Sequence, residues 1–152
     1  MVSSEGQEER HYQAGDIICS ENERPDGLYI VKDGMVEIFH KLVSDQGSSE
    51  VHLGRVGVRG MFGEMGIIDH QPRSASARAL GPTTLVFISR QAFQKHLEEL
   101  PPWVAILVKT MVHRLREANL RLVRTMEAAE AGRLNLDRQE LIISHGEAES
   151  KT

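Results

Sequence analysis

Between Gln13 and Ser89 the sequence consists of short runs rich in β-branched residues, which Gly, Pro and Asp interrupt at close intervals. Such runs are typical of strands, and the interrupting residues are those that turns require. Leu28 to Phe39 is the clearest case, because Asp33-Gly34 predicts a tight hairpin there. Further strands are expected at Asp16–Ser20, Glu50–Val56, Ala75–Leu80 and Thr84–Ser89. Short strands at this spacing predict a small sandwich or barrel.

After Ser89 the pattern changes to that of helices. Gln91–Glu99 is expected to form a short helix, and Pro101-Pro102 to open a longer one, since the first helical turn tolerates proline. Apolar or small residues then recur at alternating spacings of four and three, along one seam of that helix: Val104, Val108, Met111, Leu115, Ala118, Leu122, Thr125 and Ala129. The seam suits either self-association or packing on the protein's own strands. Gly132 is expected to end the helix.

The 152 residues match the usual size of one domain. With 22 acidic and 18 basic side chains, the net charge of −4 argues against a chain built as a whole to grip nucleic acid. The single cysteine, Cys19, is expected to be a small buried hydrophobe in a reducing compartment. No apolar run reaches the length of about 18 residues that a membrane span needs, so a cytoplasmic location without membrane contact is predicted.

The segment 61–79 carries the strongest chemical signal. Gly63 to Ile68 predicts one or two helical turns, whose free N–H groups attract an anion. Arg73 follows Glu64 by nine residues and precedes three small residues, so that a ligand can approach the guanidinium, which suits a phosphate. A carboxylate would repel a phosphate unless it faced another group, such as a sugar hydroxyl. Glu64 and Arg73 together therefore indicate a ligand that carries both groups.

This segment resembles the phosphate-binding cassette of cyclic nucleotide-binding domains, which occur in bacterial catabolite activator proteins, cyclic-nucleotide-dependent kinases and cyclic-nucleotide-gated channels. The matching motifs are Phe62-Gly63-Glu64 and Pro72-Arg73-Ser74-Ala75-Ser76, at the family's usual separation, and residues 15–18 and 27–36 resemble its early strands and hairpin. The resemblance covers about Tyr12 to Met126, and two linked motifs make it far more specific than an isolated glycine pattern.

The expected fold is mainly β with C-terminal helices: a β-sandwich or jelly roll of about eight strands with a phosphate-binding cassette and a long C-terminal helix. The cyclic nucleotide-binding domain is expected over 12–130, with a β-roll at about 12–89 and helices at about 91–130. Residues 131–152 are expected to form a short helical or flexible tail, in which Leu141, Ile142 and Ile143 offer a docking surface for an effector protein.

The resemblance also implies roles for single residues. Arg73 would pair with the cyclic phosphate, and Glu64 would accept a hydrogen bond from the ribose 2′-hydroxyl. The remaining ligand-binding residues implied are Phe62, Gly63, Met65, Ser74, Ala75 and, as a polar contact of the base, Asn119. The sequence departs from the family's commonest pattern at Met65-Gly66, where a branched apolar residue followed by Ala is usual. Glycine there is expected to loosen the turn by about 0.5–1 kcal/mol relative to Ala.

No catalytic or metal-binding residue is predicted. The seven histidines are scattered, without the close pair that a metal-dependent oxygenase on a jelly roll would need, and the sequence contains no nucleophile elbow and no Walker loop. Basic residues on the long helix are expected to form a solvated face rather than a DNA contact, because Glu117 and Glu127 interrupt them: Lys109, Arg114, Arg116, Arg121 and Arg124. Tyr29 and Trp103 are expected to be packing residues.

The first interpretation is a cytoplasmic sensor that binds a cyclic mononucleotide, cAMP ahead of cGMP, and transmits occupancy through movement of the long helix to an effector protein or within a homodimer. One alternative is a fragment of a Crp/Fnr-like transcription regulator, since a helix-turn-helix module of about 60 residues does not fit into 131–152. Another is a scaffold or interaction protein of this fold that no longer binds nucleotide, against which Glu64 and Arg73 count.

Overall fold

The computed structural model describes residues 6–45 and 47–149. The chain divides into two units, Met1–Glu117 and Ala118–Thr152. The side chains from 134 onward, including the predicted docking residues Leu141, Ile142 and Ile143, lie outside the described residues.

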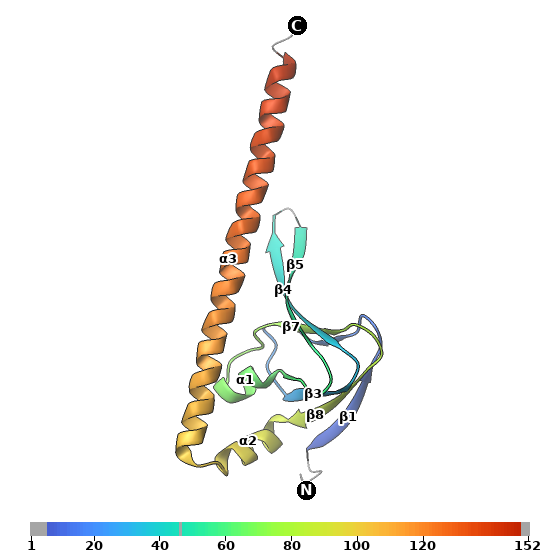
Figure 1. Ribbon diagram of the computed structural model, residues 1–152, viewed down its shortest axis with the longest axis vertical. Coiled ribbons are helices and arrows are strands. Elements are labelled where there is room, and N and C mark those ends of the chain that lie inside the picture. Colours follow the sequence, from blue (N-terminus) through green and yellow to red (C-terminus); the bar gives the residue numbers. More distant parts are fainter. Residues whose placement is uncertain (1–5, 46, 150–152) are drawn as a thin grey trace. The chain divides into compact units, whose positions relative to one another are not determined.

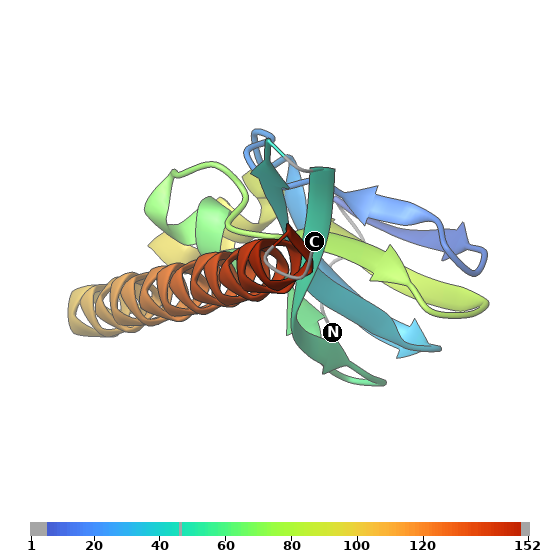
Figure 2. The same ribbon diagram turned by 90° about the horizontal axis from the view of Figure 1, so that it is seen from above.

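Eight strands form two antiparallel sheets in the first unit, as the sequence predicts. The strands are β1 (Gln7–Tyr12), β2 (Ile17–Cys19), β3 (Gly27–Asp33), β4 (Val36–Ser44), β5 (Gly47–Val56), β6 (Met61–Phe62), β7 (Ser76–Ala79) and β8 (Thr83–Ser89). One sheet has the order β1-β8-β3-β6 and the other β2-β7-β4-β5. Two short helices, α1 (Glu64–Asp69) and α2 (Arg90–Glu98), lie together at one end of the strands (Figures 1 and 2).

The first strand begins earlier than the sequence analysis expects. β1 pairs with β8 along its whole length, from Gln7 opposite Ile88 to Tyr12 opposite Thr83. It is an edge strand of polar residues, none of them fully buried, and Tyr12 at its end packs against the core. A strand held mainly by main-chain hydrogen bonds leaves no alternating apolar pattern in the sequence, which is why the turn-and-run pattern begins only at Gln13.

The hairpin predicted at Asp33-Gly34 is wrong. The strands on either side of this turn, β3 and β4, belong to different sheets, so that the chain crosses between the layers there. Gly34 has a φ of 93°, and a Cβ atom on it would lie 2.5 Å from Thr83 Oγ1 and 2.6 Å from the Pro82 carbonyl oxygen. Glycine is therefore needed at 34, because the turn there passes close to the turn at 82–83. The long hairpin of the fold is instead β4–β5 (Figure 1).

The core between the sheets is small and aromatic at its centre. The Tyr29 ring stacks on the Phe62 ring with centroids 5.1 Å apart, and the Phe87 ring packs against Tyr29 at 5.3 Å. Cys19 is buried in the same cluster, as predicted. Because Phe62 is the first residue of the cassette's first motif, this cluster anchors the start of the cassette to the core.

The two C-terminal helices begin where the sequence places them. α2 follows directly after β8, and its first turn is capped by the Ser89 hydroxyl, which accepts a hydrogen bond from the Ala92 N–H at 3.2 Å. The third helix, α3 (Pro102–Glu149), opens at the predicted proline but does not end at Gly132, contrary to the expectation. A single glycine costs a helix only about 1 kcal/mol, which good helix formers on both sides offset.

Within the first unit, the predicted seam of α3 does not act as a single packing face. Val108 packs with Val112 against Met65 and Ile68 of α1, whereas Met111 and Leu115 of the same seam are exposed. Trp103 is also exposed, so the expectation that it packs within the chain is wrong.

Candidate functional site

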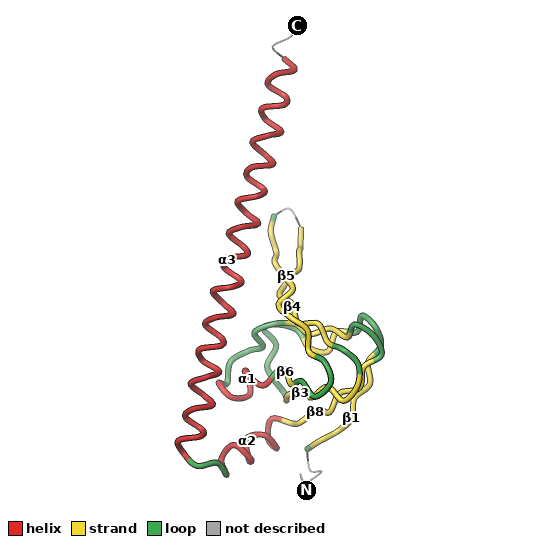
Figure 3. The backbone as a smooth tube through the Cα atoms, in the orientation of Figure 1, coloured by secondary structure: helices red, strands yellow, loops and turns green. Residues whose placement is uncertain are grey.

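Seven of the eight predicted ligand-binding residues lie on one continuous stretch from the end of β6 through α1 to the start of β7. Figure 3 shows the loop that leads from the end of α1 toward β7 and carries Arg73, Ser74 and Ala75. The eighth, Asn119, lies on α3 in the second unit, so its contact with the base stays a prediction.

Arg73 is the most buried charged residue of this stretch, with a side chain only 4% exposed. Its Nη1 donates to the Gly63 carbonyl at 3.1 Å, and its Nη2 donates to Asp26 Oδ1 at 3.0 Å and to the Gly27 carbonyl at 2.9 Å. A guanidinium has five N–H donors, of which these bonds use three. The Nε–H and the second Nη1–H have no hydrogen-bond partner among the described residues, and both suit a phosphate oxygen.

The main chain of Arg73 is held by the loop between β2 and β3. Its N–H donates to the Glu23 carbonyl and its carbonyl accepts from the Asn22 N–H, both at 2.9 Å. With Asp26 on the side chain, this loop fixes the arginine from both ends. The contact of this loop with Arg73 could not be predicted from the sequence, because no spacing rule connects Asp26 with a residue 47 positions away.

Gly63 allows this arrangement through its missing side chain. Its φ is 79°, a left-handed conformation that favours glycine, and a Cβ atom there would lie 2.5 Å from Arg73 Nη1. Its carbonyl also accepts one of the arginine's hydrogen bonds. Any other residue would therefore push the guanidinium away from its anchor.

Glu64 begins α1 and is largely withdrawn from solvent. Burial raises the pKa of its carboxyl group, against the smaller opposing effects of its own backbone N–H and of the positive charge of Arg73. The structure shows no hydrogen bond between this carboxylate and another side chain among the described residues. A half-buried acceptor of this kind is suited to receive a hydrogen bond from a ligand hydroxyl.

The other cassette residues differ in what they offer. Phe62 and Met65 are buried in apolar clusters. The Ser74 hydroxyl lies 3.8 Å from Met65 Sδ, as a weak hydrogen bond, and Ala75 is half-buried beside it. Small side chains at 74 and 75 leave their backbone amides accessible to an anion.

The glycine at 66 has a different meaning from the one the sequence suggests. A Cβ atom there would lie 2.4 Å from Pro25 Cγ and 2.6 Å from the Gln71 carbonyl oxygen. Both neighbours belong to loops that hold Arg73, so Gly66 lets these loops pack tightly on α1 rather than loosening the turn.

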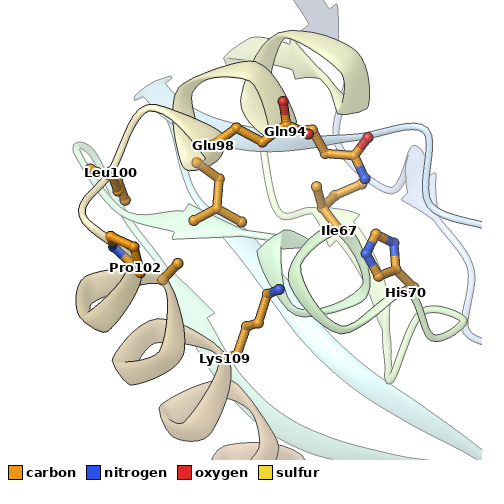
Figure 4. Close-up of a pocket in the computed structure, with 9 residues that line it drawn as sticks. Ile67, His70, Gln94, Glu98, Leu100, Pro102 and Lys109 are labelled. Atoms are coloured by element: carbon orange, nitrogen blue, oxygen red, sulfur yellow. The ribbon is translucent and has the colours of Figure 1, made fainter.

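A separate cavity of about 330 Å³ lies among α1, α2 and the start of α3 (Figure 4). It is lined by Ile67, His70, Gln94, Leu97, Glu98, Leu100, Pro102, Ala105 and Lys109, none of which is a predicted ligand-binding residue. Over the described residues, the side chains form no cluster of three or more His, Cys, Asp or Glu that could hold a metal ion. Within that same part of the chain, no helix is long and apolar enough to cross a bilayer.

The two antiparallel sheets form a β-roll that carries the cassette, and the sequence matches the cyclic nucleotide-binding domain family over residues 9–99. The chain belongs to this family.

Among its curated relatives, the cyclic AMP receptor protein of Thermus thermophilus is 34% identical over 113 residues, which cover 74% of this chain and 51% of the relative. An uncharacterised ABC transporter ATP-binding protein of Mycobacterium tuberculosis is 38% identical over 87 residues, which cover 57% of this chain and 26% of the relative. The chain thus spans between about a quarter and about half of these two proteins.

Solved structures agree with the fold. The EAL enzyme Bd1971 in its cAMP-bound form superposes with a TM-score of 0.68 at 32% identity, covering 76% of this chain and 30% of that one. The regulatory domain of Toxoplasma gondii PKA, crystallised with cAMP, superposes with a TM-score of 0.59 at 20% identity, covering 72% and 40%, and supports the fold alone.

Proposed function

We propose that the chain is a sensor that binds a cyclic mononucleotide, with cAMP preferred over cGMP. The observation that carries the proposal is Arg73: a buried guanidinium held on three donors, with the Nε–H and one Nη1–H left for a phosphate. Glu64, nine residues before Arg73, supplies an acceptor for the ribose 2′-hydroxyl. A 3′,5′-cyclic nucleotide carries both groups at a fixed separation.

The cradle is completed by main-chain groups. The amides of Ser74 and Ala75 and the backbone of Gly63 surround the phosphate, while Phe62 and Met65 support the cassette from below through their apolar clusters. For Asn119, the role as the polar contact of the base stays the prediction that the family resemblance implies. All of these roles bind and orient the ligand, so we propose a binding module and not an enzyme.

Relatives support the ligand class. The Thermus protein is named a cyclic AMP receptor, and the EAL enzyme has been solved with cAMP and with cGMP. To separate the two nucleotides, Ser74→Ala is informative, because this hydroxyl can bond either the phosphate or the amino group of a syn guanine. Selective loss of cGMP binding supports the second role, and equal losses for both nucleotides reject it.

We also propose that the first unit associates with a second copy through α3. Trp103, Leu107, Met111 and Leu115 follow one another at intervals of four and are all exposed, as is Ile106 beside them. A helix strip of this kind is self-complementary, because two copies can bury it against each other. Sedimentation equilibrium should show a dimer that Leu107→Gln with Met111→Gln disperses, whereas Arg55→Gln, at an exposed position on β5, leaves it intact.

The output of the sensor is the position of α3, read by a partner protein in the cytoplasm. A ligand shifts that position only by the difference between its affinities for the two states. The chain spans about half of the Thermus receptor, so a fragment of a Crp/Fnr-like transcription regulator is the second candidate. A longer chain that carries a DNA-binding module after α3 would establish that alternative.

Calorimetric titration with cAMP and with cGMP tests the proposed function. Arg73→Lys keeps the charge but loses the planar fork, and it should weaken binding about 10- to 150-fold, the effect of losing a charge-assisted hydrogen bond. Arg114→Lys is the matched control and should bind like the wild type. Wild-type protein that takes up neither nucleotide at millimolar concentration would favour the scaffold alternative.

A further inference from the structure

Arg116, one of the basic residues of α3, makes specific contacts with the cassette. Its Nη2 donates to Asp69 Oδ1 at 2.9 Å, its Nε donates to Asp69 Oδ2, and its Nη1 donates to the Pro72 carbonyl at 3.3 Å. The side chains of Arg116 and Asp69 are each only 17% exposed. The expectation of a solvated position is therefore wrong for Arg116. Its guanidinium instead bonds both ends of one loop, at Asp69 and at Pro72.

Asp69 and Pro72 are the two ends of the loop that leads to Arg73. Asp69 is the last residue of α1, Pro72 directly precedes Arg73, and Asp69 Oδ1 also accepts the Gln71 N–H at 3.1 Å. His70, between them, has a φ of 58°, so the chain turns sharply there. One guanidinium on α3 thus closes a four-residue turn immediately before Arg73.

The Arg116 contact adds hydrogen bonds between α3 and the cassette where apolar packing between them is partial. On one side, Val108 and Val112 pack against Met65 and Ile68. Near His70 and Lys109 the packing is incomplete, because the cavity of about 330 Å³ separates α1 from the start of α3 (Figure 4). Side chains on opposite walls of this cavity do not pack against one another, so apolar packing alone fixes this end of α3 weakly.

We propose that Arg116 is a positioning residue for nucleotide binding: it holds the loop 69–72 in the shape that presents Arg73, and it links that shape to the position of α3. This role rests on the proposed function. Because linkage is reciprocal, a ligand that depends on the loop's shape also stabilises the Arg116 contact. The ion pair preorganises the cassette, so its loss weakens binding.

The test compares Arg116→Lys with Arg114→Lys. Lysine keeps the charge but cannot bond both carboxylate oxygens and the Pro72 carbonyl at once. Titration with cAMP should show an affinity about 3- to 10-fold weaker for Arg116→Lys, which is in the lower part of the range for coupled contacts, and an unchanged affinity for Arg114→Lys. Amide exchange should also become faster at Gln71, whose N–H depends on Asp69.

The doubly reversed variant Asp69→Arg with Arg116→Asp separates positioning from mere support of the fold. It should recover part of the affinity that either single change loses. If Arg116→Lys fails to fold, Asp69→Asn provides the same comparison. If Arg116→Lys binds cAMP with the same affinity as the wild type, the positioning role alone is overturned. If the wild type binds neither cAMP nor cGMP, the proposed function is overturned and this role with it.

Discussion

Replacing Gly66 with alanine tests how tightly the loops are packed on α1. The added Cβ atom would lie 2.4 Å from Pro25 Cγ and 2.6 Å from the Gln71 carbonyl oxygen, well inside the 3.4 Å at which ordinary contact begins. Alanine in a helix gains about 1 kcal/mol over glycine, but overpacking costs about 1–3 kcal/mol. We therefore expect the free energy of unfolding to fall by about 0–2 kcal/mol, with about 1 kcal/mol as the central value.

For a chain of this size, a loss of about 1 kcal/mol lowers the melting temperature by about 2–4 °C. Thermal unfolding followed by circular dichroism measures this, and cAMP titration should show weaker binding, because Pro25 adjoins Asp26 and Gln71 lies in the loop before Arg73. Gly54→Ala is the control, since a Cβ atom there meets nothing within 4 Å. A Gly66→Ala variant that melts higher than wild type and binds as well would refute the packing argument.

Three further predictions concern single side chains. Burial raises the pKa of Glu64, so between the ordinary value near 4.5 and the raised value the folded protein binds more protons than the unfolded chain. Ionising the buried carboxyl group therefore lowers the free energy of unfolding. This loss is complete above the raised pKa and disappears as the pH falls to about 4.5. Glu64→Gln should thus be more stable than wild type in urea at about pH 7, with no such advantage at about pH 4, yet bind cAMP more weakly, because an amide oxygen accepts a weaker hydrogen bond than a carboxylate; a variant that is less stable at neutral pH would contradict this. Asp26→Ala removes one of the three hydrogen bonds of Arg73 and should weaken cAMP binding in calorimetry, while lowering stability by at most about 1 kcal/mol because the Asp26 side chain is 63% exposed; unchanged affinity would show that the two carbonyls suffice. Burial raises the pKa of the Cys19 thiol, so it should react with a thiol reagent far more slowly in the folded protein than in urea, and equal rates would show that the core opens readily.

Local patterns were enough to predict much of the fold. Turn residues and β-branched runs located most strands, and Pro101-Pro102 located the start of α3. The two cassette motifs predicted the candidate site. Each of these signals lies within a few residues along the chain. The sequence analysis failed for β1, whose polar residues pair through the main chain, and for Asp33-Gly34, where the same dipeptide serves a hairpin or a crossing between sheets equally well.

Within the site, the missing parts were contacts between distant segments. Asp26 reaches Arg73 and Arg116 reaches Asp69, each across 47 residues, and no periodicity links such pairs. Gly66 was misjudged for the same reason, since its purpose lies in the neighbouring loops and not in its own helical turn. The sequence identified the groups that could meet a ligand, whereas the residues that position those groups required the fold.

The central claim is that Arg73 binds the phosphate of a cyclic nucleotide through donors that no described residue uses. The Nε–H of arginine gives its own signal in a proton–nitrogen NMR spectrum, and Arg73→Lys identifies the signal that belongs to residue 73. We predict that this signal moves strongly downfield when cAMP is added to saturation, because the Nε–H then bonds a phosphate oxygen. If cAMP binds while the Arg73 Nε–H signal stays where it was, the claim is contradicted.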